Sequence, residues 1–151
     1  MKILDYLDEE KVILDLKKGE KKAVIERLVS FLMKCGGEGD SEKIVKALMD
    51  REKTGSTGIG NGVAIPHAKT DAVDSLRVAY AYSASGIEYD AVDGKSAHFF
   101  FMVVSPPSEA SAQLRLLARI SRLMGNRLLR NELKAADSAE KAIATIRKYD
   151  E

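Results

Sequence analysis

The chain has 151 residues, the size of one ordinary domain, and its 45% apolar and 31% charged residues are typical of water-soluble globular proteins. Its 24 Lys and Arg against 23 Asp and Glu leave a formal net charge of +1, which disfavours nucleic-acid binding because such proteins need a basic excess. Without a run of about 18 apolar residues, the sequence predicts no membrane insertion. The acidic start MKILDYLDEE does not fit a secretion signal either.

The single cysteine, Cys35, has no partner for an internal disulfide, so we expect a small, buried apolar group in a protein of the reducing cytoplasm. The two histidines, His67 and His98, lie far apart in the sequence, and no cysteine stands at metal-ligand spacing from them. The sequence therefore predicts no metal site.

Local signals define the first elements in chain order. Residues 12–16 are typical of a short strand. Apolar residues at helical spacing predict a helix over 20–35, which the glycines at 36 and 37 end. A second helix follows, capped by Asp40 or Ser41 and ending near Glu52.

The second half of the chain alternates between strand and helix patterns. Strands are predicted at residues 76–82 and 97–104, and the latter is apolar enough to be covered on both faces. Helices are predicted around 114–124, over 127–134, and from the capping pair Asp137 and Glu140 to about Arg147. Residues 1–151 therefore predict one domain, an α/β (α+β) sandwich with a small mixed β-sheet flanked by helices on both faces.

Four glycines between residues 55 and 62 mark a segment unlike the rest. So many glycines indicate positive φ angles or close backbone approach, and glycine-rich loops often turn their amides toward an anion. A Walker A loop needs Lys where Asn61 stands, and a dinucleotide fingerprint needs Gly where Val63 stands. The sequence therefore predicts no nucleotide cofactor here.

The imidazole of His67 follows Pro66, whose ring fixes its own φ and restricts Ile65 to extended geometry. A neutral imidazole on a stiff backbone is a good nucleophile and can carry a phosphoryl group. Phosphate-binding residue types lie nearby in sequence: Arg51, Ser56, Thr57 and Lys69. From the residues alone, a structural histidine beside an ordinary glycine turn remains an alternative.

Residues 51–67, REKTGSTGIGNGVAIPH, closely resemble the phosphorylation-site motif of the type-2 EIIA family of the bacterial phosphoenolpyruvate-dependent phosphotransferase system. This family comprises fructose, mannitol and nitrogen-regulatory members. The resemblance covers nearly the whole chain, through LDEEKVILDL at 7–16, DAVDGK at 90–95 and LRLLARISRL at 114–123. It implies a mixed sheet flanked by helices, in agreement with the pattern of elements.

The resemblance also implies a phosphohistidine relay without a cofactor. The phosphorylated histidine of the family falls on His67 and the arginine of its motif on Arg51, which would stabilise the phosphoryl charge. Thr57, Gly58 and Gly60 would shape or line the pocket. The expected donor is an HPr-type phosphocarrier protein, and the expected acceptor is a cysteine of an EIIB domain.

One departure from the family concerns the start of the late helix, where a second histidine usually precedes the leucine that is Leu114 here. This chain has Gln113, which can donate an amide N–H to a phosphate but cannot carry a charge. We expect His67 to be phosphorylated still, with an altered rate or phosphoryl stability. His98 does not match the family's second histidine, and we interpret it as a strand residue.

Two functions are compatible with the resemblance: a relay that feeds a sugar permease, and a regulatory module whose phosphorylation state selects its binding partners. The segment GIGNGVAIPH and the absence of a fused EIIB or membrane segment favour the nitrogen-regulatory branch. A separate sugar-specific EIIA would look the same. Gln113 also leaves open a third interpretation, a relative kept only for binding without phosphorylation.

Overall fold

The computed structural model describes residues 1–37 and 39–151, and its centre is a six-stranded mixed sheet. The strand order is β1-β5-β6-β3-β2, and β4 pairs with β6 beyond the end of β3. β5 and β6 are antiparallel, as are β2 and β3, whereas β1 on β5 and both β3 and β4 on β6 are parallel. The strands are β1 (Val12–Ile13), β2 (Gly58–Gly60), β3 (Val63–Ala64), β4 (His67–Lys69), β5 (Arg77–Ile87) and β6 (Ala97–Ser105).

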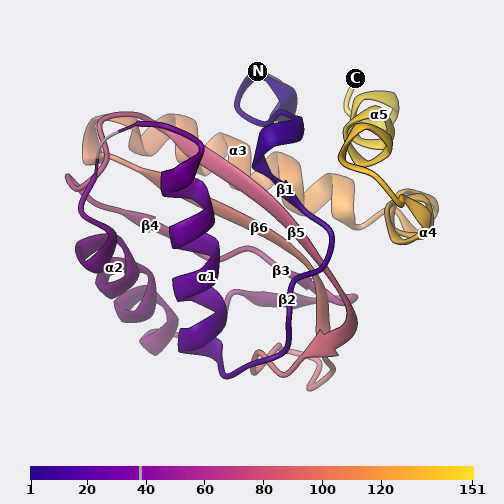
Figure 1. Ribbon diagram of the computed structural model, residues 1–151, viewed down its shortest axis with the longest axis horizontal. Helices are drawn as coiled ribbons and strands as arrows, with labels where there is room; N and C mark the ends of the chain where they lie inside the picture. Colours follow the sequence, from indigo (N-terminus) through magenta and orange to yellow (C-terminus); the bar gives the residue numbers. More distant parts are fainter. Residues whose placement is uncertain (38) are drawn as a thin grey trace.

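Helices cover both faces of this sheet, which confirms the predicted α/β sandwich (Figure 1). One face carries α1 and α2, and the other carries α3, α4 and α5, so each face has its own apolar core. The helices are α1 (Lys21–Lys34), α2 (Ser41–Lys53), α3 (Ala110–Met124), α4 (Arg127–Ala135) and α5 (Ala139–Tyr149), with 3-10 turns at Ile3–Asp5, Glu9–Lys11 and Pro107–Glu109.

Strand β6 lies in the middle of the sheet because both of its faces are apolar. Phe99, Phe101 and Val103 contribute to the core under α3–α5, whereas Phe100 and Met102 contribute to the core under α1 and α2. Alternate residues of a strand point to opposite faces, so a strand buried on both sides needs this nearly continuous apolar run. The sequence-based prediction of a doubly covered strand is confirmed.

The predicted helix signals are confirmed with small shifts. Asp40 caps α2, and its carboxylate accepts from the backbone N–H groups of Glu42 and Lys43. The last helix is capped by Ser138, not by Asp137 as predicted, because the Ser138 hydroxyl accepts from the backbone of Lys141. The predicted strand at 12–16 forms ladder pairs only at Val12 and Ile13.

The prediction that Cys35 is buried is wrong. Cys35 is half-exposed, because it lies at the C-terminal cap of α1, where its thiol donates to the carbonyl of Glu10. Leu114 is 70% exposed, because α3 is rotated so that Gln113, Leu116, Ile120 and Met124 face the sheet. Among the described residues, none of the helices is long and apolar enough to cross a membrane.

Candidate functional site

The glycine-rich segment folds as a β-hairpin of β2 and β3. Asn61 and Gly62 form its turn with φ angles of 58° and 75°, as a type I′ turn requires at both central positions. Its backbone groups bond within the protein: the Gly58 N–H donates to the Ser56 hydroxyl at 3.0 Å, and the Gly58 carbonyl accepts from Val92 at 3.0 Å. The segment is thus the turn that the sequence left open as an alternative.

Gly58 and Gly60 have structural reasons to be glycine. A Cβ at Gly58 would lie 2.8 Å from the Cα of Ala91, and Gly60 has a φ of +95°. Neither glycine lines the two clefts beside His67, whereas Ser56, Thr57 and Ile59 do. The two glycines therefore shape the hairpin and do not contact the space next to the imidazole.

The hairpin leads directly into the strand that carries His67. The backbone N–H of Ile65 donates to Thr57 at 2.9 Å, and the carbonyl of Pro66 accepts from Val103 at 2.9 Å. His67 then begins β4, where it pairs with Val103 of β6. Both sides of the proline are anchored in the sheet, so the position of His67 is fixed by the backbone.

The imidazole of His67 is half-buried and held by its own backbone. Its Nδ1 lies 2.8 Å from the carbonyl oxygen of Ile65. Since that oxygen can only accept, Nδ1 carries the hydrogen and Nε2 keeps its lone pair. Burial lowers the pKa of His67 below its ordinary value, and the positive charge of Arg51 acts in the same direction. At neutral pH the ring is therefore uncharged, with Nε2 as its nucleophilic atom.

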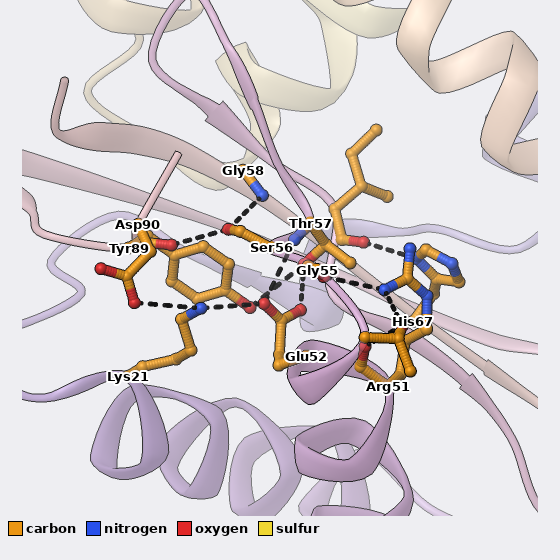
Figure 2. Close-up of polar contacts among 12 residues, drawn as sticks. Lys21, Arg51, Glu52, Gly55, Ser56, Thr57, Gly58, His67, Tyr89 and Asp90 are labelled. Atoms are coloured by element: carbon orange, nitrogen blue, oxygen red, sulfur yellow. Dashed lines mark hydrogen bonds and ion pairs between the residues drawn. The ribbon is translucent and has the colours of Figure 1, made fainter. Parts of the chain in front are cut away.

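The guanidinium of Arg51 is fixed beside this ring (Figure 2). Arg51 lies in the last turn of α2, and its Nη1 donates to the Thr54 hydroxyl at 3.0 Å and to the carbonyl of Gly55 at 2.8 Å. These two contacts use one guanidinium nitrogen. The other guanidinium nitrogens make no hydrogen bond to the described residues, and Arg51 lines the same clefts as His67, so it can bind two oxygens of an anion there.

Two adjoining clefts meet at His67, with volumes of about 510 and 300 Å³. His67, Arg51, Leu114 and Leu117 line both, and among the described residues no carboxylate side chain lines either. The larger cleft adds the side chain of Lys69. The clefts are therefore cationic and free of acidic groups, which suits a phosphate-sized anion.

A buried polar network lies behind the hairpin (Figure 2). The carboxylate of Glu52, only 7% exposed, accepts from both the backbone N–H and the hydroxyl of Thr57. Lys21 of α1 donates to the same carboxylate at 3.1 Å and reaches Asp90 at 3.5 Å. The Tyr89 hydroxyl lies 3.3 Å from that of Thr57. This network fixes Thr57, which lines the cleft.

Gln113 lines the larger cleft, but its amide group is already engaged. Its Nε2 donates to the carbonyl of Ala68 at 2.8 Å and to the Ser105 hydroxyl at 3.1 Å. An amide nitrogen has two hydrogens, so donation to a phosphate would need one of these bonds to break. In this structure Gln113 holds the strand next to His67.

The remaining sequence candidates lie away from this site. His98 is near the other end of β6 and lines neither cleft. Within the described part of the chain, no group of three potential metal-ligating side chains comes together. A larger cleft of about 720 Å³ lies between α1 and α2 and contains none of the predicted site residues. We place the candidate site at His67 because the chemistry of its lining, not its volume, suits an anion.

The residues that support the site from distant parts of the chain carry no local signal in the sequence. Glu52 directly follows Arg51, but its burial depends on Lys21 and Tyr89, which are 31 and 37 positions away. Only the fold brings them together. The Asn61–Gly62 pair was a usable local signal for the hairpin turn.

The fold and the site together define a class: an α/β domain that presents one uncharged histidine in a cationic surface cleft. The chain belongs to the EIIA 2 family of the phosphoenolpyruvate-dependent sugar phosphotransferase system, because the sequence model of that family matches residues 5–149.

Relatives carry both transport and regulatory names. The fructose-specific EIIABC component of Bacillus subtilis is 35% identical over 99% of this chain, but the chain spans only 24% of that protein's length. The fructose-specific EIIA component of Haloferax volcanii is 38% identical over 80% of this chain and 78% of its own. A nitrogen regulatory protein of Pseudomonas aeruginosa is 33% identical over 81% of this chain and 79% of its own length.

Solved structures of the same fold include the nitrogen regulatory protein IIA-Ntr from Neisseria meningitidis. It superposes with a TM-score of 0.87 at 28% identity, covering 94% of this chain and 97% of its own. The mannitol enzyme IIA of Escherichia coli, solved in complex with phosphorylated enzyme IIB, has a TM-score of 0.80 at 19% identity and covers 94% and 97%. That second likeness concerns the fold alone.

Proposed function

We propose that this protein accepts a phosphoryl group on Nε2 of His67 from an HPr-type phosphocarrier and then passes it to an EIIB domain or holds it as a regulatory state. The observation that carries the proposal is the contact between His67 Nδ1 and the Ile65 carbonyl. It leaves Nε2 as the nucleophile in a cationic cleft without carboxylates.

In the proposed transfer, the lone pair of His67 Nε2 attacks the phosphorus of the donor's phosphohistidine. The new N–P bond forms as the donor's N–P bond breaks, and that electron pair returns to the donor imidazole. The His67 ring becomes positively charged because Nδ1 keeps its hydrogen. The Ile65 carbonyl, already 2.8 Å away, stabilises this charge without any rearrangement.

Arg51 stabilises the three phosphoryl oxygens in this proposal. Its guanidinium is held by Thr54 and Gly55, so little side-chain entropy is lost when it binds the anion. Charge-assisted bonds of this kind are about twice as strong as neutral ones. Thr57 lines the cleft but gives its hydroxyl hydrogen to Glu52, and Gln113 gives both amide hydrogens to the protein. We therefore assign both to positioning.

The surface around His67 favours a protein as donor and acceptor. Leu114 is 70% exposed and Ile59 is 40% exposed, and both line the smaller cleft together with Ala118. Exposed apolar side chains around a charged centre form the kind of surface that another protein covers. In such a complex the cleft is closed to water, which protects the phosphoryl group during transfer.

A regulatory module is the second candidate, favoured by the likeness to the nitrogen regulatory proteins. Phosphorylation would place nearly two negative charges between Leu114 and Ile59, and would disfavour any partner that buries these side chains. The two functions share the phosphorylation step and differ in what reads it. Gene neighbours separate them, since a permease gene supports transport and a sigma-factor region supports regulation.

The test is incubation with phosphoenolpyruvate, Enzyme I and a phosphocarrier, followed by mapping of the acid-labile label. We expect label on His67 and none in His67→Ala, while His98→Ala stays labelled. Label on another residue would refute the site. A His67→Ala variant with full function in cells would instead support the pure binding module.

A further inference from the structure

The pairing of β5 with β6 is interrupted by a bulge beside His98. Tyr82 of β5 pairs with Phe99, and Ile87 pairs with Ala97, so the four residues 83–86 stand opposite His98 alone. On its other side, the carbonyl of Gly62 accepts from the backbone N–H groups of both His98 and Phe99. Bulges of this kind redirect a side chain and often occur at functional sites.

The bulge holds the His98 imidazole in one orientation. Its Nδ1 lies 2.8 Å from the Ser83 carbonyl, so Nδ1 carries the hydrogen and Nε2 is left open. Gly86 has a φ of +83°, and a Cβ there would lie 2.9 Å from the ring's Cε1. A side chain at position 86 would therefore displace the ring. The local backbone is built around this histidine.

The ring faces a small pocket that the function proposed above does not use. The pocket has a volume of about 160 Å³, room for about five water molecules at roughly 30 Å³ each. Helix α4 contributes three polar side chains: Arg130 and Asn131, which are adjacent, and Lys134 one turn later. Its lining residues are Tyr82, Ala84, His98, Phe99, Arg130, Asn131 and Lys134, none of them acidic.

The cationic groups of this pocket have no counter-charge. Arg130 is half-buried, and its Nη1 donates to the carbonyl of Met124 at 2.7 Å, which fixes the guanidinium. Within residues 1–37 and 39–151, neither Arg130 nor Lys134 belongs to an ion pair, although Lys148 and Lys141 nearby do. Two positive charges without a carboxylate favour an anion.

A neutral donor completes the lining. The side chain of Tyr82 is mostly buried, but its hydroxyl is accessible to solvent and makes no hydrogen bond to the part of the chain that the structure describes. This hydroxyl can therefore donate a hydrogen bond to a bound group. The pocket thus gathers donors from Tyr82, Asn131, Arg130 and Lys134 beside the oriented ring of His98.

We propose that this pocket between the β5 bulge and α4 binds a phosphate-sized oxyanion, either free phosphate or the phosphate group of an ester. The site is separate from His67. Val103, the partner of His67 in the sheet, lies five positions beyond His98 on β6, which corresponds to about 17 Å at roughly 3.3 Å per residue. Helices α4 and α2 also lie at opposite ends of the molecule (Figure 1).

Titration of the ¹⁵N-labelled full chain with inorganic phosphate tests this proposal by NMR, because His98 and His67 report on the two sites separately. We expect saturable shifts of the His98 ring and of the Asn131 side-chain amide, with a Kd below about 10 mM. Lys134→Ala should weaken this binding about tenfold. Arg127→Ala removes the same charge from an exposed position on α4 outside the pocket, and should leave Kd within about twofold.

A second titration with glycerol 3-phosphate distinguishes the two sources of phosphate. Tighter binding of the ester assigns the pocket to a phosphorylated metabolite, and tighter binding of phosphate assigns it to the free ion. Equal weakening by Lys134→Ala and Arg127→Ala, shifts confined to His67, or no saturation by about 10 mM would each overturn the proposal. A negative titration would not affect the proposal that His67 is phosphorylated, because that proposal is tested separately by mapping the acid-labile label.

Discussion

Replacement of Glu52 by glutamine tests whether the buried network supports the candidate site. The carboxylate accepts from Lys21 at 3.1 Å, from the Thr57 backbone at 3.1 Å and from the Thr57 hydroxyl. Glutamine keeps the oxygen that serves the first two donors, and its amide nitrogen faces the hydroxyl, which must then accept. The shape is preserved while the charge is lost.

The expected loss of folding stability follows from the types of hydrogen bond that Glu52 makes. Hydrogen bonds to a charged group contribute about 1.5–3 kcal/mol and neutral ones about 0.5–1.5 kcal/mol. With the two bonds to Oε1 each weakened by about 1 kcal/mol, Glu52→Gln should destabilise the fold by about 2 kcal/mol. Glu52→Ala leaves Lys21 and Thr57 without this acceptor and should cost about 3–5 kcal/mol.

Urea unfolding measures the loss of folding stability in the Glu52 variants, and a transfer assay measures how fast they accept the phosphoryl group. Glu42→Gln, an exposed change in the first turn of the same helix, should alter stability by less than about 0.5 kcal/mol. Displacement of Thr57 should slow transfer to Glu52→Gln about tenfold. The negative charge of Glu52 raises the pKa of His67, so its loss should also move the pH–rate profile to lower pH. Stability and transfer both equal to those of Glu42→Gln would refute this reasoning.

Three further predictions concern His67, Gly58 and Gln113. Because burial lowers the pKa of His67, transfer should fall to half only below pH 6.5, and a midpoint above 6.5 would contradict this. The unfolded chain takes up this proton first, so stability should decrease as pH falls from about 6.5 to the lower folded-state pKa, and His67→Gln should remove that slope. Gly58→Ala places a Cβ 2.8 Å from the Cα of Ala91 and should cost about 1–3 kcal/mol in urea unfolding, whereas an unchanged midpoint would refute the close contact. Gln113→His should change the transfer rate or the phosphohistidine lifetime several-fold, and equal values for both would rule out a role for this position.

The helices are predictable from the sequence because their signals are local. Asp40 caps α2 through its own neighbouring backbone, and the glycines after Cys35 end α1 within one turn. The apolar run of β6 likewise indicates a strand covered on both faces. These local signals do not determine how a helix is rotated against the sheet. The exposure of Leu114 therefore follows only from the packing of α3 in the structure.

Of the candidate site, the sequence supplies the reactive groups, and the fold supplies their surroundings. His67 and Arg51 stand out through the motif that contains them, and the structure places them on the same clefts. Strands β2 and β3 were not predicted, because the glycines of this segment suggest a loop. The contacts of Glu52 with Lys21 and of Gln113 with Ala68 join distant parts of the chain, so no local pattern predicts them.

The ring nitrogen that carries the phosphoryl group is the most direct test of the account. Phosphorylated protein labelled with ¹⁵N in its histidines, prepared with a phosphocarrier and examined by NMR, shows which nitrogen couples to phosphorus. The account predicts coupling at Nε2 of His67, with Nδ1 still bearing its hydrogen toward Ile65. Phosphorus on Nδ1 of His67, or on any other residue, would contradict it.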